Sequence, residues 1–428
     1  MLMAWVVALA LAGQDDLEQA LQRIKASSMR MTVDYLSADA LAGRCAGEPT
    51  NERAADFLGR RLSAFGLDPV GDGGSFFQEF TFGVRGGGGR KATARNVLGL
   101  WEGSDPQLKD EIVVIGAHMD HVGTVASFDA GRIGTVVGED DIWNGADDNA
   151  SGTATVLAIA EAFCRGGLRP RRSILFMFFN AEEHGLLGSA HYCREPIIPL
   201  EKTYAMLNMD MVGRNPELPL SVMGIGSARF GVWNRWIQIA QAAAPALELK
   251  LVDYAQADSD HDSFLSVGVP AAFMFSGLHE DYHRVTDHAS LLDEERMAQV
   301  GRFSAALLWK AANSDEPLEF QKPVFEGRKR RTLEINTAGA LTAAEMEERG
   351  LSRNQGGFRV TQVREGSVAA VAGLRVDDVI LSVRGRALSV DQPAVSLRRL
   401  VAASPRNQEV EIGIWRDGEE KTLRAVWK

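Results

Sequence analysis

The sequence is built on short apolar runs that end in a histidine or a carboxylate. The clearest, residues 173–179, reads Ser-Ile-Leu-Phe-Met-Phe-Phe and is soon followed by the adjacent carboxylates Glu182 and Glu183. Residues 111–116 form a similar run that leads into His118. Such runs are typical of strands that are buried on both faces. The pattern therefore predicts strands with polar carboxyl ends, where ligand sites form in open α/β sheets.

Amphipathic helical patterns alternate with these strands. Residues 153–165 carry apolar side chains at helical spacing and end at two glycines, and residues 294–312 form another such segment. The alternation predicts an α/β fold with a mixed, mainly parallel sheet sandwiched by helices. An ordinary charged loop would explain any one of the polar strand ends, but it does not explain their repetition.

Composition excludes several classes of protein. The chain has 428 residues, 45% of them hydrophobic, and a formal net charge of −11. These values are typical of a globular protein and argue against nucleic acid as a general partner. Only three cysteines are present, Cys45, Cys164 and Cys193, so the chain is not a disulfide scaffold.

The first 13 residues are apolar and are followed abruptly by Gln-Asp-Asp. This pattern predicts a signal peptide at residues 1–13 and a secreted or periplasmic protein, although no Lys or Arg precedes the apolar run. A short buried helix is the alternative. No segment has the length expected of a membrane span.

The composition changes after residue 313. Pro317, Pro323 and the basic run at residues 328–331 suggest a linker over residues 314–333. Residues 334–428 then alternate as strands, with an Asp-Gly turn at residues 417–418. We expect a large domain over residues 14–313 and a small, mainly β domain over residues 334–428.

The polar side chains at the strand ends resemble a metal-ligand set. They include His118, Asp120, Asp147, Asp148, Glu182, Glu183, Asp210 and His283. Imidazoles and carboxylates without thiolates suit Zn²⁺ or a similar divalent ion. Five ligands can hold two metals if one carboxylate bridges them. Adjacent residues of an extended chain point in opposite directions, so one glutamate of the Glu182–Glu183 pair can bind metal while the other moves a proton.

These motifs together resemble peptidase family M28, the co-catalytic dizinc aminopeptidases. The resemblance runs from about Leu36 to Trp309. It rests on His118-x-Asp120, Gly-Ala-Asp-Asp-Asn-Ala-Ser-Gly at residues 145–152, Ala181-Glu-Glu183, Asn208-Met-Asp210 and Tyr282-His283. It implies a zinc-exopeptidase fold and two Zn²⁺ ions per chain.

The resemblance also implies roles for individual residues. The metal ligands would be His118, Asp148, Glu183, Asp210 and His283. Asp148 would bridge both ions, and its peptide bond to Asn149 is expected to be cis. Glu182 would be the general base that acts on a zinc-bound water nucleophile, and Asp120 would accept the second imidazole N–H of His118.

Other polar residues have weaker expected roles. Tyr282 would polarise the substrate carbonyl, and His261 is a candidate substrate contact. Asp147 is expected to be a loop residue. Four histidines are expected to be polar loop residues as well: His121, His184, His279 and His288.

The C-terminal segment resembles a bacterial PDZ domain. The similarity is carried by Gly-Gly-Phe-Arg-Val at residues 356–360, residues 366–374 and residues 377–381. PDZ domains bind a peptide C-terminus as an added strand. Gly356, Gly357 and Phe358 are the expected carboxylate loop. Alternatively, this domain only packs on the catalytic domain.

The expected function is hydrolysis of N-terminal residues from peptide substrates, with a C-terminal peptide as possible PDZ ligand. Three alternatives stay open: a glutaminyl cyclase-like zinc transferase, a carboxypeptidase of the same fold, and a non-catalytic binding protein recruited through the PDZ domain.

Overall fold

The computed structural model describes residues 15–427, apart from 84–89, 128–139, 255–258, 324–332, 334, 353–355, 389–395, 398–399, 402–403 and 405–407. The expected signal peptide and the basic run at residues 328–331 lie outside the described residues. The chain forms two compact units, Met1–Val324 and Phe325–Lys428. Among the described residues, none of the helices combines the length and apolar character that a membrane span requires.

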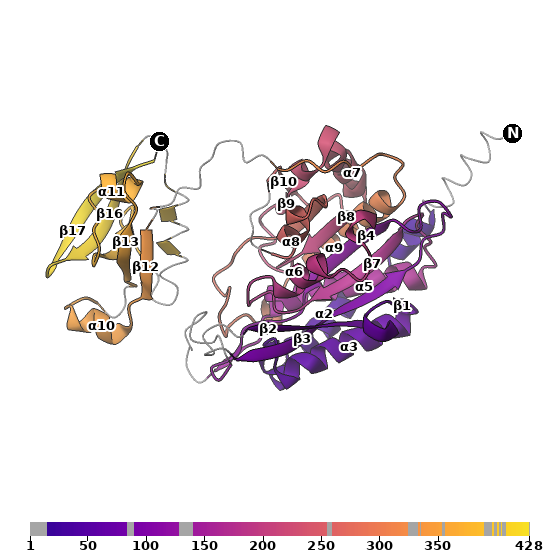
Figure 1. Ribbon diagram of the computed structural model, residues 1–428, viewed down its shortest axis with the longest axis horizontal. Helices are drawn as coiled ribbons and strands as arrows, with labels where there is room; N and C mark the ends of the chain where they lie inside the picture. The colour runs from indigo at the N-terminus through magenta and orange to yellow at the C-terminus, as the bar shows by residue number, and fades with distance from the viewer. Residues whose placement is uncertain are drawn as a thin grey trace. The chain divides into compact units, whose positions relative to one another are not determined.

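The first unit is built on a nine-stranded mixed sheet (Figure 1). Its strand order is β1-β3-β7-β4-β8-β11-β9-β10, and β2 pairs with β3. The strands are β1 (Asp68–Pro69), β2 (Phe77–Gly83), β3 (Lys91–Trp101), β4 (Ile112–His118), β7 (Ser173–Phe179), β8 (Thr203–Met209), β9 (Leu220–Met223), β10 (Leu249–Val252) and β11 (Ala271–Phe275). A separate short pair consists of β5 (Gly123–Thr124) and β6 (Ile142–Trp143).

The centre of the sheet is parallel. Strand β4 pairs in parallel with β7 on one side and β8 on the other, and β8 pairs in parallel with β11. Every residue of β4 and β7 is buried. The carboxyl ends of these strands therefore meet at one edge of the sheet.

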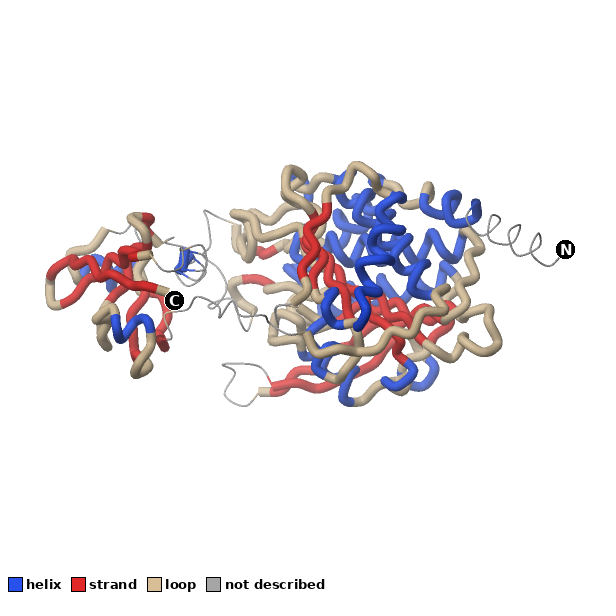
Figure 2. The backbone as a smooth tube through the Cα atoms, turned by 90° about the horizontal axis from the view of Figure 1, so that it is seen from above, coloured by secondary structure: helices blue, strands red, loops and turns tan. Residues whose placement is uncertain are grey.

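Helices cover both faces of this sheet (Figure 2). Alternate residues of β4 enter different cores. Val113 and Ile115 belong to the core that also contains residues of α2 (Ala26–Leu36), α3 (Pro49–Phe65), α5 (Gly152–Arg165), α7 (Val232–Ala240) and α9 (Glu294–Ala312). Ile112 and Val114 pack with α6 (Leu187–Arg194) and α8 (His261–Ser266). The period-two alternation of a strand thus produces the predicted sandwich.

The beginning of the predicted linker is part of the first unit. Arg172 donates to the carbonyl oxygen of Ser314, and the indole of Trp236 donates to Glu316. The amide of Gln321 donates to the carbonyl oxygen of Ser227. Proline and charge suggested a linker from residue 314, but this segment is anchored by polar contacts that composition does not reveal.

The second unit contains a six-stranded sheet with the order β12-β13-β14-β16-β17, and β15 pairs with β14. Its elements are β12 (Ile335–Ala340), α10 (Ala343–Glu348), β13 (Phe358–Val363), α11 (Val368–Val371), β14 (Val379–Val383), β15 (Arg386–Ala387), β16 (Glu409–Arg416) and β17 (Glu419–Val426). Val360, Ile380, Ile412 and Ile414 contribute to its own hydrophobic core.

The predicted carboxylate loop does not fit this topology. Phe358 begins β13, which is paired with β12 on one side and β14 on the other. The Gly356 amide donates to Leu388, and the Gly357 carbonyl accepts from Leu341. A peptide cannot add as a strand beside β13, because both of its edges are occupied. The Gly-Gly-Phe pattern was misassigned because a turn entering an interior strand has the same composition as one entering an edge strand.

Candidate metal centre

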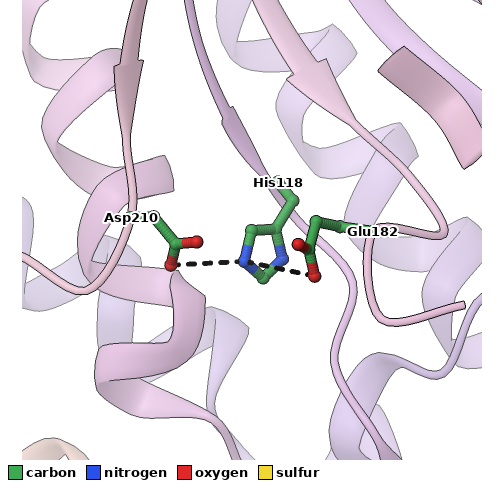
Figure 3. A group of neighbouring side chains, drawn as sticks. All are labelled: His118, Glu182 and Asp210. Carbon is green, nitrogen blue, oxygen red and sulfur yellow. Dashed lines mark ion pairs between the residues drawn. The ribbon is translucent and has the colours of Figure 1, made fainter. Parts of the chain in front are cut away.

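The candidate site lies at the carboxyl ends of three adjacent parallel strands. His118 is the last residue of β4, Asp210 follows β8, and the Glu182–Glu183 pair follows β7. Figure 3 shows the His118 imidazole between the carboxylates of Asp210 and Glu182. Because β7, β4 and β8 are neighbours in the sheet, these side chains converge although they are distant in sequence.

Asp148 reaches the same place from the turn η3 (Ala146–Ser151), which precedes α5. Its peptide bond to Asn149 is cis, as predicted. The Asn149 side chain donates to the Met209 carbonyl and accepts from the Gly152 amide, so it joins the turn to the end of β8. A carboxylate oxygen of Asp287 accepts the amides of Asp147 and Asp148 at 2.9 and 3.1 Å.

The two oxygens of Asp148 face different histidines. Oδ1 lies 3.3 Å from Nε2 of His118, and Oδ2 lies 2.9 Å from Nε2 of His283. Each histidine has a second carboxylate beside the same nitrogen: Asp210 at 3.4 Å from His118, and Glu183 at 3.2 Å from His283. The site therefore has two similar halves that share Asp148.

These distances fit metal ligands. Two ligands at ~2.0–2.1 Å from a tetrahedral zinc ion lie about 3.3 Å apart. Asp210 Oδ1 is buried and has no hydrogen-bond partner among the described residues, as expected of a metal ligand. Glu182 Oε2 is farther away, 4.0 Å from Nε2 of His118. The donor set therefore fits two ions, with Glu182 beside one half.

The site concentrates negative charge away from water. Burial and repulsion by Glu183 raise the pKa of Glu182 well above its usual range, although His118 opposes this. Burial also favours the neutral form of Glu183, but His283 and His121 lower its pKa to about 2. Burial lowers the pKa of His118, but Asp210 and Glu182 outweigh it and raise that pKa well above normal. Several carboxylates buried close together repel one another, so bound cations would stabilise them.

Asp120 has a different contact from the predicted one. The nearest acceptor to Nδ1 of His118 is the backbone carbonyl of Asp120 at 3.3 Å, whereas its carboxylate is 3.8 Å away. The Asp120 carboxylate instead accepts the amides of Glu182 and Glu183, at 3.1 and 3.3 Å. It therefore orients the backbone that carries both glutamates. The sequence placed Asp120 near the site but could not distinguish its carbonyl from its carboxylate.

Arg44 is a buried arginine next to the site that holds neighbouring segments together, and the sequence analysis did not identify it. Its guanidinium is fully buried and donates to the carbonyls of Leu36, Met119, Asn144 and Gly145. Burial lowers its pKa to about 10, while Asp120 and Asp148 oppose the shift. The side chain joins the loop after β4 to the turn that carries Asp148. A buried arginine in a polar link has no sequence pattern that reveals it.

Tyr282 lies beside the site, with its ring stacked on His283 at a centroid distance of 3.8 Å. Burial and the charges of Asp148 and Glu183 raise its pKa well above 10, so its phenol stays protonated. His261 is completely buried and stacks on Phe273 at 4.3 Å. Its ring therefore offers no exposed surface to a substrate, contrary to the candidate role.

Two histidines assigned to polar loops are buried beside acidic side chains. Nδ1 of His121 lies 2.7 Å from Oε1 of Glu183. Nε2 of His279 lies 3.2 Å from Asp147, whose other oxygen accepts the Gly213 amide. His121 follows Asp120 directly, and this proximity to a strand end was the one signal that could have identified it.

The comparisons with known proteins agree with this geometry. Residues 96–308 match the model of peptidase family M28, and residues 359–416 match a PDZ domain. This part of the chain belongs to peptidase family M28. The predicted M28 and PDZ assignments are thereby confirmed, and the M28 domain contains each of the expected ligands.

Curated relatives include two bacterial proteins. Leupeptin-inactivating enzyme 1 of Streptomyces exfoliatus is 29% identical over 205 residues, which are 46% of this chain and 39% of that protein. Aminopeptidase YwaD of Bacillus subtilis is 27% identical over 234 residues, 52% of this chain and 46% of that protein. The chain thus spans less than half the length of these relatives.

Solved structures share the fold of the M28 domain. An aminopeptidase from Aneurinibacillus sp. strain AM-1 has a TM-score of 0.55 at 18% identity, covering 71% of this chain and 98% of that one. Glutaminyl cyclase from Porphyromonas gingivalis has a TM-score of 0.54 at 21% identity, covering 66% and 97%. These likenesses confirm the predicted zinc-exopeptidase fold and do not by themselves distinguish the reaction.

Proposed function

We propose that this chain is a two-zinc aminopeptidase that hydrolyses N-terminal residues from peptides. The observation that carries the proposal is the placement of Asp148, whose oxygens face His118 and His283 at 3.3 and 2.9 Å. His118, Asp210 and Asp148 would hold one ion, and His283, Glu183 and Asp148 the other. The Bacillus subtilis relative is named an aminopeptidase, which supports cleavage from the N-terminus of the peptide.

Bound zinc lowers the pKa of a water ligand to about 7 and polarises a carbonyl. The protein groups supply proton transfer and orientation. Glu182 lies beside the first half of the site, 4.0 Å from Nε2 of His118, where a carboxylate can take a proton and pass it to a leaving amine. The amides of Glu182 and Glu183 are held by Asp120, which fixes the direction of both carboxylates.

Tyr282 would donate a hydrogen bond from its phenol to the substrate carbonyl oxygen. Its raised pKa keeps the phenolic proton in place at neutral pH, and its stacking on His283 holds the ring beside the second half of the site. A hydrogen bond that strengthens as negative charge develops on the carbonyl oxygen lowers the barrier.

The C-terminal PDZ domain would bind a peptide C-terminus. Among the described strands, β12, β17 and the short β15 each pair with a single neighbour, so an added peptide strand would pair with one of these. The apolar N-terminal residues support export to the periplasm or the medium.

A panel of chromogenic amides tests the reaction. Aminoacyl amides and their N-blocked counterparts are assayed before chelation, after chelation and after zinc is restored. We expect cleavage of free-amine substrates only, lost on chelation and regained with zinc. Cleavage of C-terminal residues would indicate a carboxypeptidase. Cyclisation of N-terminal glutamine without hydrolysis would indicate a glutaminyl cyclase, and no turnover with intact zinc binding would indicate a binding protein.

A further inference from the structure

His121 is buried directly against the second half of the metal site. Its side chain is fully enclosed, and Nδ1 lies 2.7 Å from Oε1 of Glu183. The other oxygen of Glu183, Oε2, lies 3.2 Å from Nε2 of His283. The two oxygens of this carboxylate therefore face two different imidazoles.

His121 makes the shortest of the imidazole–carboxylate contacts described for the site. The four imidazole–carboxylate pairs assigned to metal binding are separated by 2.9 to 3.4 Å. Those separations surround the value of about 3.3 Å expected for two ligands of one zinc ion. The His121–Glu183 separation of 2.7 Å is that of a hydrogen bond to a charged acceptor. His121 is also 3.9 Å from Oδ2 of Asp148, the bridging oxygen on this side.

The hydrogen bond also identifies which ring nitrogen of His121 carries the proton. A carboxylate oxygen can only accept, so Nδ1 of His121 must carry the proton. Nε2 is buried and has no hydrogen-bond partner among the described residues. Among the residues that the structure describes, the ring therefore has one side-chain hydrogen bond, from Nδ1 to Glu183.

We propose that His121 is a positioning residue that makes Glu183 a single-oxygen ligand. The Nδ1–H of His121 engages Oε1 of Glu183 and leaves Oε2 directed at His283, so Oε2 would be the oxygen that ligates an ion held there. A carboxylate that contributes one oxygen leaves a coordination position for water or substrate. This inference rests on the proposed two-metal function.

The proposal is tested by the affinity of the second zinc ion, with asparagine and glutamine at position 121 as a matched pair. Both are neutral amides, but the asparagine N–H₂ can lie near the position of Nδ1, whereas the glutamine N–H₂ reaches the position of Nε2. Metal content and stepwise binding are measured by calorimetry on apo protein, and thermal unfolding of each apo variant is recorded. His191→Asn, a change at a buried histidine on α6, is the control.

We expect wild type, His191→Asn and His121→Asn to bind two ions with second-site affinities within a few-fold of one another. His121→Gln should weaken the second site ~10–100-fold, the usual cost of losing a partner that orients a ligand. Equal affinities for His121→Asn and His121→Gln would overturn the proposal, and so would weak second-site binding by His121→Asn, which would mark His121 as a ligand. A wild-type stoichiometry of one ion would instead overturn the two-metal function itself.

Discussion

Oδ2 of Asp148 lies 2.9 Å from Nε2 of His283, although the two residues belong to different loops that connect strands to helices. Asp148 belongs to the turn before α5, and His283 lies between β11 and α9. Asp287, four residues after His283, binds the amides of Asp147 and Asp148. The two connections are therefore tied together independently of any metal, and this pre-organises the second half of the site.

The two adjacent glutamates should respond differently to the same substitution. Glu182→Gln should lower kcat by ~10²–10⁴, since it removes the proton carrier, and should leave metal content unchanged. Glu183→Gln should lose the second ion as well, because its Oε2 faces His283. Metal analysis and kcat on both purified variants check this. Metal loss in Glu182→Gln, or a kcat within tenfold of wild type, would remove Glu182 from the proposed role.

Replacement of Arg44 should destabilise the protein even without metal. Arg44→Met leaves four backbone carbonyls without their donor, and a buried acceptor left unsatisfied costs about 1–3 kcal/mol. Denaturant unfolding of the apo protein measures the loss. Arg302→Met is the control, because the exposed Arg302–Glu295 pair should contribute under about 1 kcal/mol. Equal stability of the two variants would argue against this stabilising role of Arg44.

The apo protein should lose stability as pH rises from about 4 to above 7. Burial raises the pKa of Asp260 and of Asp287 from 3.8 to about 7. An acid with a raised native pKa stabilises the fold fully below its unfolded pKa, and this contribution is lost as pH rises through the native value. The raised pKa of His118 acts in the same direction, above its usual 6.5.

Zinc should reverse this trend, because it needs deprotonated ligands and compensates their charge. The zinc-induced rise in Tm should therefore be larger at pH 8 than at pH 5.5. Thermal unfolding with chelator and with zinc at both pH values tests the sign. A larger rise at pH 5.5 would mean that carboxylate crowding does not govern metal binding.

Truncation should reveal where the first unit ends. A chain ending at residue 324 should fold and hydrolyse small amides, since every proposed site residue precedes that point. A chain ending at residue 313 should be less stable, because it lacks Ser314 and Glu316, the partners of Arg172 and Trp236. Tm and amide hydrolysis compare the two chains. Equal Tm values would show that residues 314–324 contribute nothing to the first unit.

Sequence predicted the parallel sheet and the convergence of polar strand ends for one physical reason. Apolar strands such as β4 and β7 have to be buried, and parallel strands direct their carboxyl ends to the same edge. The sequence therefore predicted that His118 and Glu182 lie at strand ends, and the structure has them at the ends of β4 and β7. The helix α9 (Glu294–Ala312) also has its predicted bounds.

The remaining features depend on long-range polar contacts, for which sequence has no periodic signal. The burial of Arg44, the contact of His121 with Glu183, and the packing of residues 314–321 are of this kind. The misplaced carboxylate loop has a related cause. Whether β13 is an interior or an edge strand depends on the partners β12 and β14, which local composition does not specify.

Anomalous diffraction at the zinc edge, from crystals of the zinc-loaded protein, tests the central claim most directly. We expect two peaks, one bound by His118, Asp210 and Asp148 and the other by His283, Glu183 and Asp148. Each oxygen of Asp148 should ligate one ion, and Glu182 should ligate neither. A single peak, or two peaks without Asp148 between them, would contradict the two-metal account.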